Sequence, residues 1–171
     1  MMRGYDFIWR LARPLLPLML AWRARSGKED AGRLTERFGR YDHRTDLPDD
    51  PLWIHAVSVG ETVAGIALAE AIRKTGETAP ILMTTNTVTA AARVAALPAS
   101  LGVTHLYQPL DHPDMVAAFL HRIRPRIGLF LESDFWPTLI MATAAGCVPV
   151  AFVSAQLLSL IHISEPTRQK P

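Results

Sequence analysis

A glutamate follows a short apolar run at a point where a carboxylate can act on a ligand. Residues 52–61 read LWIHAVSVGE, so a run typical of a buried strand passes directly into Ser-Val-Gly-Glu. Gly60 permits a sharp backbone turn and the close approach of a ligand. A carboxylate in the first turn of the next helix is stabilised by the helix dipole, and it can take a proton from a substrate hydroxyl. Glu61 is therefore a candidate general base. The alternative is that it only complements the dipole of its helix.

The segments around this turn alternate between strand patterns and helix patterns. Apolar runs predict strands at residues 52–59, 80–85, 103–108, 127–133 and 148–154. Between them, apolar residues at helical spacing predict helices at residues 62–75, 88–97, 114–123 and 137–145. Continuous apolar strands that alternate with helices indicate an α/β fold, in which a Rossmann-like parallel sheet has helices on both faces.

Polar residues recur where the predicted strands end. In a parallel sheet, ligands bind beyond the carboxyl ends of the strands, so these residues are expected to meet at one edge. They are Ser58, Gly60, Glu61, Thr84, Thr85, Asn86, Thr87, Gln108, Asp111, Glu132, Ser133, Asp134, Trp136, Ser154 and Gln156. For three polar residues a structural role is the preferred interpretation: Thr87 and Asp114 cap helices, and Asp111 makes a turn.

Several familiar chemistries lack their motifs in this chain. The first strand-to-helix turn, SVGETVAG, contains neither the glycine pattern of dinucleotide-binding proteins nor a P-loop. Ser58 lacks the first glycine of a hydrolase nucleophile elbow, and there is no H-E-x-x-H zinc motif. His55 is interpreted as a core histidine because it lies within a predicted strand, and Asp49 and Asp50 as a solvated turn. No metal and no cofactor is expected.

The composition is that of one globular domain with a basic N-terminus. Of 171 residues, 49% are apolar, which is enough for a sizeable core. The single cysteine, Cys147, excludes an internal disulfide and is expected to pack in the core. Residues 1–40 carry nine Lys or Arg against four Asp or Glu, a net charge of +5, which leaves −3 for the other residues.

The first 25 residues predict a membrane-associating segment. Residues 5–22 are mainly apolar and aromatic, and the longest uninterrupted apolar run, residues 14–22, has nine residues. A membrane span needs about 20 such residues, so a segment lying in the membrane interface is favoured. The alternative is an amphipathic helix that packs on the protein's own surface. The basic segment GRLTERFGRY, residues 32–41, is expected to face anionic lipid or an anionic substrate.

Four motifs, in this order and at these intervals, resemble a known enzyme family. HAVSVGET, TTNTVTAAARV, LESDFWPTLI and VSAQL are similar to the N-terminal half of the 3-deoxy-D-manno-octulosonic acid (Kdo) transferases of lipid A assembly, and the likeness covers about residues 5–157. The resemblance implies the N-terminal half of a GT-B glycosyltransferase. In that arrangement, residues 1–25 associate with the membrane and residues 26–157 form a Rossmann-like acceptor-binding domain.

The resemblance also implies a reaction and a set of site residues. The family's enzymes are inverting glycosyltransferases of lipopolysaccharide biosynthesis, which move Kdo from CMP-Kdo to the lipid A precursor lipid IVA without a bound metal. They act at the cytoplasmic face of the inner membrane and bind no nucleic acid. By motif, Glu61 becomes the catalytic base, Ser58 and Gly60 shape its turn, and the acceptor side is lined by Thr84, Thr85, Thr87, Glu132 and Ser133. The alternative function is a non-catalytic membrane-surface module that binds an anionic glycolipid.

The end of the chain departs from the family pattern. After VSAQL it reads LSLIHISEPTRQKP, a segment without periodicity. Residues 158–171 are interpreted as a non-native tail, with a divergent native terminus as the alternative. The family's C-terminal donor-binding domain is expected to be absent, so the chain by itself is expected to be inactive as a transferase.

Overall fold

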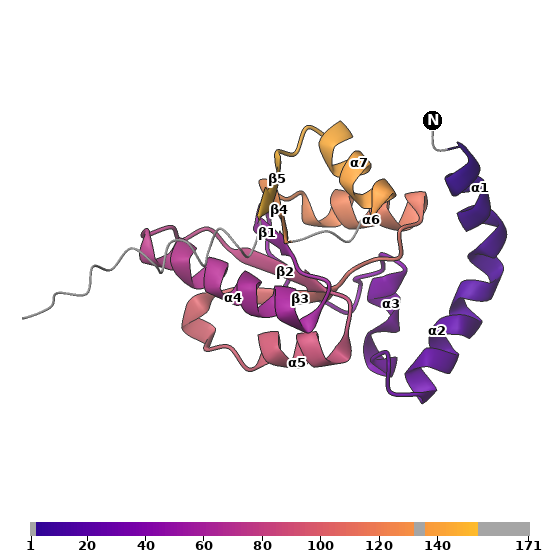
Figure 1. The fold of residues 1–171 in the computed structure, drawn as a ribbon, viewed down its shortest axis with the longest axis horizontal. Coiled ribbons are helices and arrows are strands. Elements are labelled where there is room, and N and C mark those ends of the chain that lie inside the picture. The colour runs from indigo at the N-terminus through magenta and orange to yellow at the C-terminus, as the bar shows by residue number, and fades with distance from the viewer. Residues whose placement is uncertain (1–2, 132–135, 154–171) are drawn as a thin grey trace, which may run out of the picture.

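A five-stranded parallel sheet forms the centre of the protein. The computed structural model describes residues 3–131 and 136–153. The strand order is β3-β2-β1-β4-β5, and every neighbouring pair is parallel (Figure 1). The strands are β1 (Leu52–His55), β2 (Ile81–Thr85), β3 (Val103–Tyr107), β4 (Ile127–Leu131) and β5 (Val150–Val153). This is the predicted Rossmann-like α/β fold, and the prediction is confirmed.

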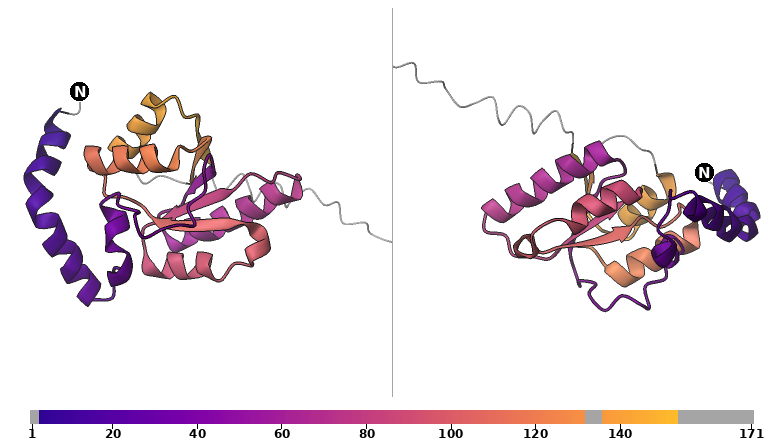
Figure 2. Two further views of the ribbon diagram at one scale, coloured as in Figure 1. Left: turned by 180° about the vertical axis from the view of Figure 1, so that it is seen from behind. Right: turned by 90° about the horizontal axis from the view of Figure 1, so that it is seen from below.

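Helices cover both faces of the sheet (Figures 1 and 2). They are α4 (Val59–Lys74), α5 (Val88–Ala95), α6 (Pro113–Ile123) and α7 (Pro137–Ala145), and a short 3₁₀ turn, η3 (Ala99–Leu101), precedes β3. One apolar cluster joins the sheet to α4 and α5 through residues such as Ala69 and Val94. The other joins it to α6 and α7 through Phe119 and Leu139, which pack with the fully buried Trp53 of β1. Because strand side chains alternate between faces, each strand contributes to both clusters.

Capping residues set the ends of these helices. Strand β1 is shorter than predicted because Ser58 is the N-cap of α4, where its hydroxyl accepts a hydrogen bond from the backbone N–H of Glu61. Thr87 caps α5 in the same way, as predicted, by accepting from the N–H of Ala90. The prediction for Asp114 is wrong, since His112 is the N-cap of α6 and accepts from the N–H of Asp114.

An N-terminal helical arm lies beside this domain, opposite the free end of α4 (Figure 2). It consists of α1 (Arg3–Ala12), η1 (Arg13–Leu15) and α2 (Leu16–Arg25). Leu16 and Leu20 are buried against the domain, whereas the apolar side chains on the outer side of the arm are 41–71% exposed. These exposed side chains are Phe7, Ile8, Leu11, Leu15, Leu18, Met19 and Trp22, and together they are called the apolar stripe below. Among the described residues, no helix combines the length and hydropathy needed to span a membrane.

The segment after the arm packs along the edge of the sheet, through η2 (Ala31–Arg33) and α3 (Leu34–Arg37). The buried carboxylate of Glu36 accepts the backbone N–H of Tyr107 at 2.8 Å, and Arg33 donates to the carbonyl of His105 at 3.0 Å. These side chains satisfy backbone groups on the outer side of edge strand β3, which protects that edge from pairing with another chain. The expectation that this basic segment faces lipid or substrate is therefore wrong for Glu36 and for Arg37, which is 3% exposed.

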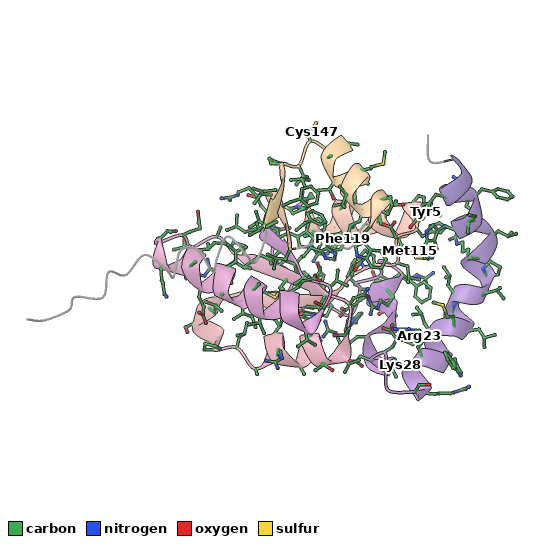
Figure 3. All side chains as sticks on the ribbon, in the orientation of Figure 1. Tyr5, Arg23, Lys28, Met115, Phe119 and Cys147 are labelled. Atoms are coloured by element: carbon green, nitrogen blue, oxygen red, sulfur yellow. The ribbon has the colours of Figure 1, made fainter. Side chains whose placement is uncertain are left out.

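A glycine allows that segment to touch α6. Gly39 has φ +70°, and a Cβ on it would lie 2.7 Å from the carbonyl oxygen of Met115. Met115 lies on the part of α6 that faces the arm (Figure 3). Neither the backbone conformation nor the space admits a side chain, so glycine is required at this contact.

Cys147 does not pack in the core, and the prediction that it does is wrong. Its side chain is exposed and the backbone has φ +58°. It follows α7, where its N–H donates to the carbonyl of Ala144 and the N–H of Val148 donates to that of Thr143. This is the Schellman arrangement, which places a left-handed residue just past the helix end.

Candidate functional site

The SVGE turn places a carboxylate at the carboxyl end of the central strand. Glu61 is half-buried, and Ser58 and Gly60 beside it are exposed. Its Oε2 accepts the backbone N–H of Val57 at 2.6 Å, and its Oε1 accepts the hydroxyl of Ser58 at 3.1 Å. Together with the Ser58 cap this is a close relative of the capping box, in which serine and glutamate satisfy each other's backbone donors. A carboxylate has about four acceptor positions, so two remain for a ligand.

A chain of hydrogen bonds connects this turn to the neighbouring loop. The N–H of Asn86 donates to the carbonyl of Val57 at 3.3 Å, and Val57 in turn donates to Glu61. Arg37 fixes Asn86 by donating hydrogen bonds to both its side-chain oxygen and its backbone carbonyl. The β1–α4 and β2–α5 loops are thus fixed to each other and to α3.

The predicted threonines occupy different environments. Thr84 is fully buried, and its hydroxyl lies 2.8 Å from both the indole N–H of Trp53 and Nδ1 of His55. Thr85 is also fully buried, with its hydroxyl 2.9 Å from Nε2 of His105. Thr87 alone is exposed, on the turn that leads into α5. Of these three threonines only Thr87 presents its side chain at the surface, while Thr84 and Thr85 support β2 from within.

Two histidines beneath this edge are held neutral. Burial lowers the pKa of His55 to about 3. For His105, burial and then the positive charges of Arg33, Arg44 and Arg37 lower the pKa to about 3. His55 is a core histidine, as predicted, although its Nε2 has no hydrogen-bond partner within the described part of the chain.

Arg37 is the centre of a buried polar network that sequence patterns did not reveal. Its guanidinium pairs with the carboxylate of Glu29 at 2.9 Å, donates to the carbonyl of Gln108 at 3.0 Å and lies over the ring of Tyr107. Glu29 also accepts a hydrogen bond from Arg23 of α2. Burial is the largest influence on Arg37 and lowers its pKa, while Glu29 opposes that effect. The one sequence signal was an arginine between Glu36 and an aromatic residue, and this local pattern does not distinguish a buried arginine from an exposed one.

Two of the predicted site residues, Glu132 and Ser133, lie outside the described residues. In residues 3–131 and 136–153, no group of three or more His, Cys, Asp or Glu side chains is arranged to hold a metal ion.

Comparison with known families identifies the domain that carries this turn. The family profile described as "3-Deoxy-D-manno-octulosonic-acid transferase (kdotransferase)" matches residues 32–160, a range that contains the whole sheet and Glu61. The chain belongs to the Kdo transferase family. The predicted family is thereby confirmed, and the Rossmann-like sheet matches the N-terminal half of a GT-B glycosyltransferase.

Individual Kdo transferases agree with this assignment. The chain is 39% identical over 153 residues to the 3-deoxy-D-manno-octulosonic acid transferase of Bordetella pertussis, with 84% of this chain and 35% of that protein aligned. It is 34% identical over 158 residues to the "Probable 3-deoxy-D-manno-octulosonic acid transferase, mitochondrial" of Arabidopsis thaliana, covering 88% and 35%. For the Haemophilus influenzae transferase the identity is 29% over 153 residues, covering 90% and 36%. The chain thus spans about a third of the length of these relatives.

Proposed function

We propose that this chain is the acceptor-binding part of an inverting Kdo transferase and that Glu61 is its catalytic base. The supporting observation is the position of the Glu61 carboxylate, on an exposed turn beyond the central strand of a Kdo transferase domain. Ligands of parallel α/β sheets bind at that edge. We assign the binding site for the donor CMP-Kdo to the part of the family's proteins that lies outside the region aligned with this chain. The complete reaction is therefore proposed for a longer protein.

In the proposed reaction, Glu61 removes a proton from an acceptor hydroxyl while the hydroxyl oxygen attacks the anomeric carbon of Kdo. The bond from that carbon to the CMP phosphate breaks, CMP leaves with the electron pair, and the proton stays on the carboxylate. Hydrogen bonds from Val57 and Ser58 hold the carboxylate in one orientation, which reduces the cost of positioning it. Thr87 is proposed to contact the acceptor directly and Glu132 and Ser133 to line the same side, while the buried Thr84 and Thr85 support the loop from within.

The apolar stripe supports association with the membrane that holds a lipid acceptor. Five of its residues, Ile8, Leu11, Leu15, Leu18 and Trp22, recur every three or four positions and so share one side of the arm. Arginines flank the stripe, as expected for an interfacial helix on anionic lipid. We place the chain peripherally at the cytoplasmic face of the inner membrane, with lipid IVA as the acceptor.

Vesicle flotation tests the membrane assignment. Replacing Leu11 and Leu18 by serine should release the chain from anionic vesicles, since each buried leucine contributes about 1.5–3 kcal/mol. The matched control replaces Val63 and Met141, two exposed apolar residues outside the arm. Equal flotation of the two double variants would count against the stripe.

The role of Glu61 is tested in a full-length transferase that carries residues 1–157 of this chain. Glu61→Gln should reduce kcat about 10²- to 10⁴-fold, because the amide preserves shape but cannot accept the proton. Glu70→Gln, an exposed change on the same helix, is the control and should leave kcat unchanged.

A second candidate function, a non-catalytic module that binds an anionic glycolipid, is favoured by one observation. Both Glu61 oxygens already accept hydrogen bonds within the turn, as a purely structural cap would. In that case Glu61→Gln should lower the melting temperature while turnover stays near normal. Measuring both quantities on the same samples decides between the two functions.

A further inference from the structure

The buried guanidinium of Arg37 uses every donor that an arginine has. An arginine side chain carries five N–H groups in a fixed planar fork. Nε and one N–H of Nη2 donate to the carboxylate of Glu29, each at 2.9 Å. The other N–H of Nη2 donates to the carbonyl of Asn86 at 2.6 Å, and Nη1 donates to the side-chain oxygen of Asn86 and to the carbonyl of Gln108. Because the side chain is only 3% exposed, these contacts hold it in one position.

The partners of Arg37 belong to loops at the carboxyl edge of the sheet. Helix α3, which ends at Arg37, lies between the helical arm and the sheet (Figure 1). Asn86 directly follows β2, and Gln108 directly follows β3. The N–H of Asn86 donates to the carbonyl of Val57, in the loop after β1, at 3.3 Å. One buried side chain thus joins the ends of three neighbouring strands.

Val57 carries this connection to the candidate base. Its N–H donates to Oε2 of Glu61 at 2.6 Å, while its carbonyl accepts from Asn86. The backbone at Val57 therefore cannot rotate without breaking one of these two hydrogen bonds. The direction of the Glu61 carboxylate depends on Asn86 in this way, and the position of Asn86 depends on Arg37.

A second arginine on the same segment has similar contacts but no path to Glu61. Arg33 pairs with the buried Glu36 at 2.8 Å and lies over the ring of Tyr107 at 4.7 Å, as Arg37 does at 5.0 Å. Its other partner is the carbonyl of His105, on the outer side of β3. Within the described residues, Arg33 makes no hydrogen bond to the loops after β1 and β2. A purely structural role would be shared by the two arginines, whereas a role at the site belongs to Arg37.

We propose that Arg37 is a positioning residue for the transfer reaction, which orients the Glu61 carboxylate through Asn86 and Val57. This inference rests on the proposed function, because it takes Glu61 as the base. It adds a residue of α3, outside the β1–α4 connection that holds Glu61, to those on which the reaction depends.

The experiment measures steady-state kinetics in a full-length transferase that carries residues 1–157 of this chain. Arg37→Lys keeps a positive charge beside Glu29, but an ammonium group has three donors and lacks the planar fork, so the contacts with Asn86 are weakened or lost. We expect kcat to fall about 10- to 100-fold, which is the effect of a misplaced catalytic group. The KM for the acceptor should change less than about twofold, because the loss falls on the transition state and not on binding.

Asn86→Ala tests the same path from its other side. It removes the side-chain oxygen that Arg37 contacts and keeps the backbone carbonyl, so kcat should fall roughly three- to tenfold. In the double variant with Arg37→Lys, the loss in kcat should be smaller than the product of the two separate losses, since both changes act on one path. A normal kcat in Asn86→Ala overturns the proposal, even if Arg37→Lys fails to fold.

Arg33→Lys is the matched control, because it alters an ion pair with a buried glutamate on the same segment and has no path to Glu61. All variants are assayed at a temperature below the melting temperature of each, where Arg33→Lys should keep the kcat of the unchanged enzyme. A normal kcat in Arg37→Lys, or an equal loss in Arg33→Lys, overturns the proposal.

A Glu61→Gln background separates this proposal from the proposed function. If Arg37 acts through Glu61, Arg37→Lys should cause no further loss of kcat once the carboxylate is replaced. A further loss as large as in the unchanged enzyme would show that Arg37 acts elsewhere and would overturn the inference. Failure of the proposed function has a different result, a near-normal kcat in Glu61→Gln alone.

Discussion

The carboxylate of Asp111 accepts the backbone N–H of Leu139 at 2.8 Å, although 28 residues separate the two in sequence. The same fully buried carboxylate accepts the N–H of Thr138 at 3.1 Å and the hydroxyl of Tyr5 at 2.7 Å. Helix α7 has no side-chain cap from its own N-cap residue, Trp136. Asp111 therefore caps α7 from another loop and ties the helical arm to it, which is a larger role than the predicted turn.

Replacing Asp111 by alanine should destabilise the protein by about 2–4 kcal/mol, because a helix cap is lost and buried donors are left unpaired. The measurement is urea unfolding followed by circular dichroism. Asp114→Ala is the control, since its ion pair with Arg13 is 61% exposed on both sides and should contribute no more than about 1 kcal/mol. Similar losses for the two variants would contradict the remote cap.

Replacing Arg37 by methionine should cost about 3–5 kcal/mol, because it leaves the buried carboxylate of Glu29 without its partner. The double variant Arg37→Met, Glu29→Gln should recover part of that loss. Arg126→Met breaks an exposed, solvent-screened pair with Asp50 and should leave the stability nearly unchanged. Chemical denaturation of all three variants gives these differences, and an Arg37 loss as small as that of Arg126 would disprove the buried pairing.

Stability should fall as the pH drops below 6.5, because His55 and His105 stay neutral in the folded state down to a pKa of about 3. The unfolded chain, with an ordinary histidine pKa of about 6.5, binds more protons in this interval and is favoured. At pH 5 each histidine should account for a loss of about 2 kcal/mol relative to pH 7 or above. Between pH 7 and pH 5, the free energy of unfolding of His105→Gln should therefore fall by about 2 kcal/mol less than that of the original chain.

The control for that comparison is His121→Gln, an exposed position on α6 that should leave the difference as it is in the original chain. If His105→Gln shows the same acid sensitivity as the control, His105 is not held neutral by burial.

Replacing Cys147 by glycine should stabilise the protein by about 0.5–1 kcal/mol, because glycine adopts φ +58° without the steric cost that a Cβ brings. Cys147→Ala keeps the Cβ and should give no such gain. Thermal unfolding under reducing conditions measures both variants. A gain for alanine equal to that for glycine would assign the effect to the thiol and not to the backbone.

The sequence by itself determined the elements and the turn that carries the candidate base. Apolar runs and helical spacing predicted each strand and each α-helix that the structure describes between residues 52 and 153, though not the short η3, because these features depend on local patterns of burial. Ser58 and Glu61 lie three residues apart, which is the spacing of a reciprocal cap, so their contact also follows from local geometry. The motifs HAVSVGET and TTNTVTAAARV pointed to the family for the same reason, since each lies within one strand-to-helix connection.

Only the tertiary structure decided which polar groups are buried and with which partners. Arg37 and Asp111 look like surface residues in sequence, yet each is buried, because its partners come from segments tens of residues away. Thr84 and Thr87 are separated by three positions, but one faces the core and the other faces solvent, since the strand ends between them. A charged or polar side chain enters the interior only when distant donors and acceptors compensate for its lost hydration, and the position of those partners is fixed by the fold and not by the local sequence.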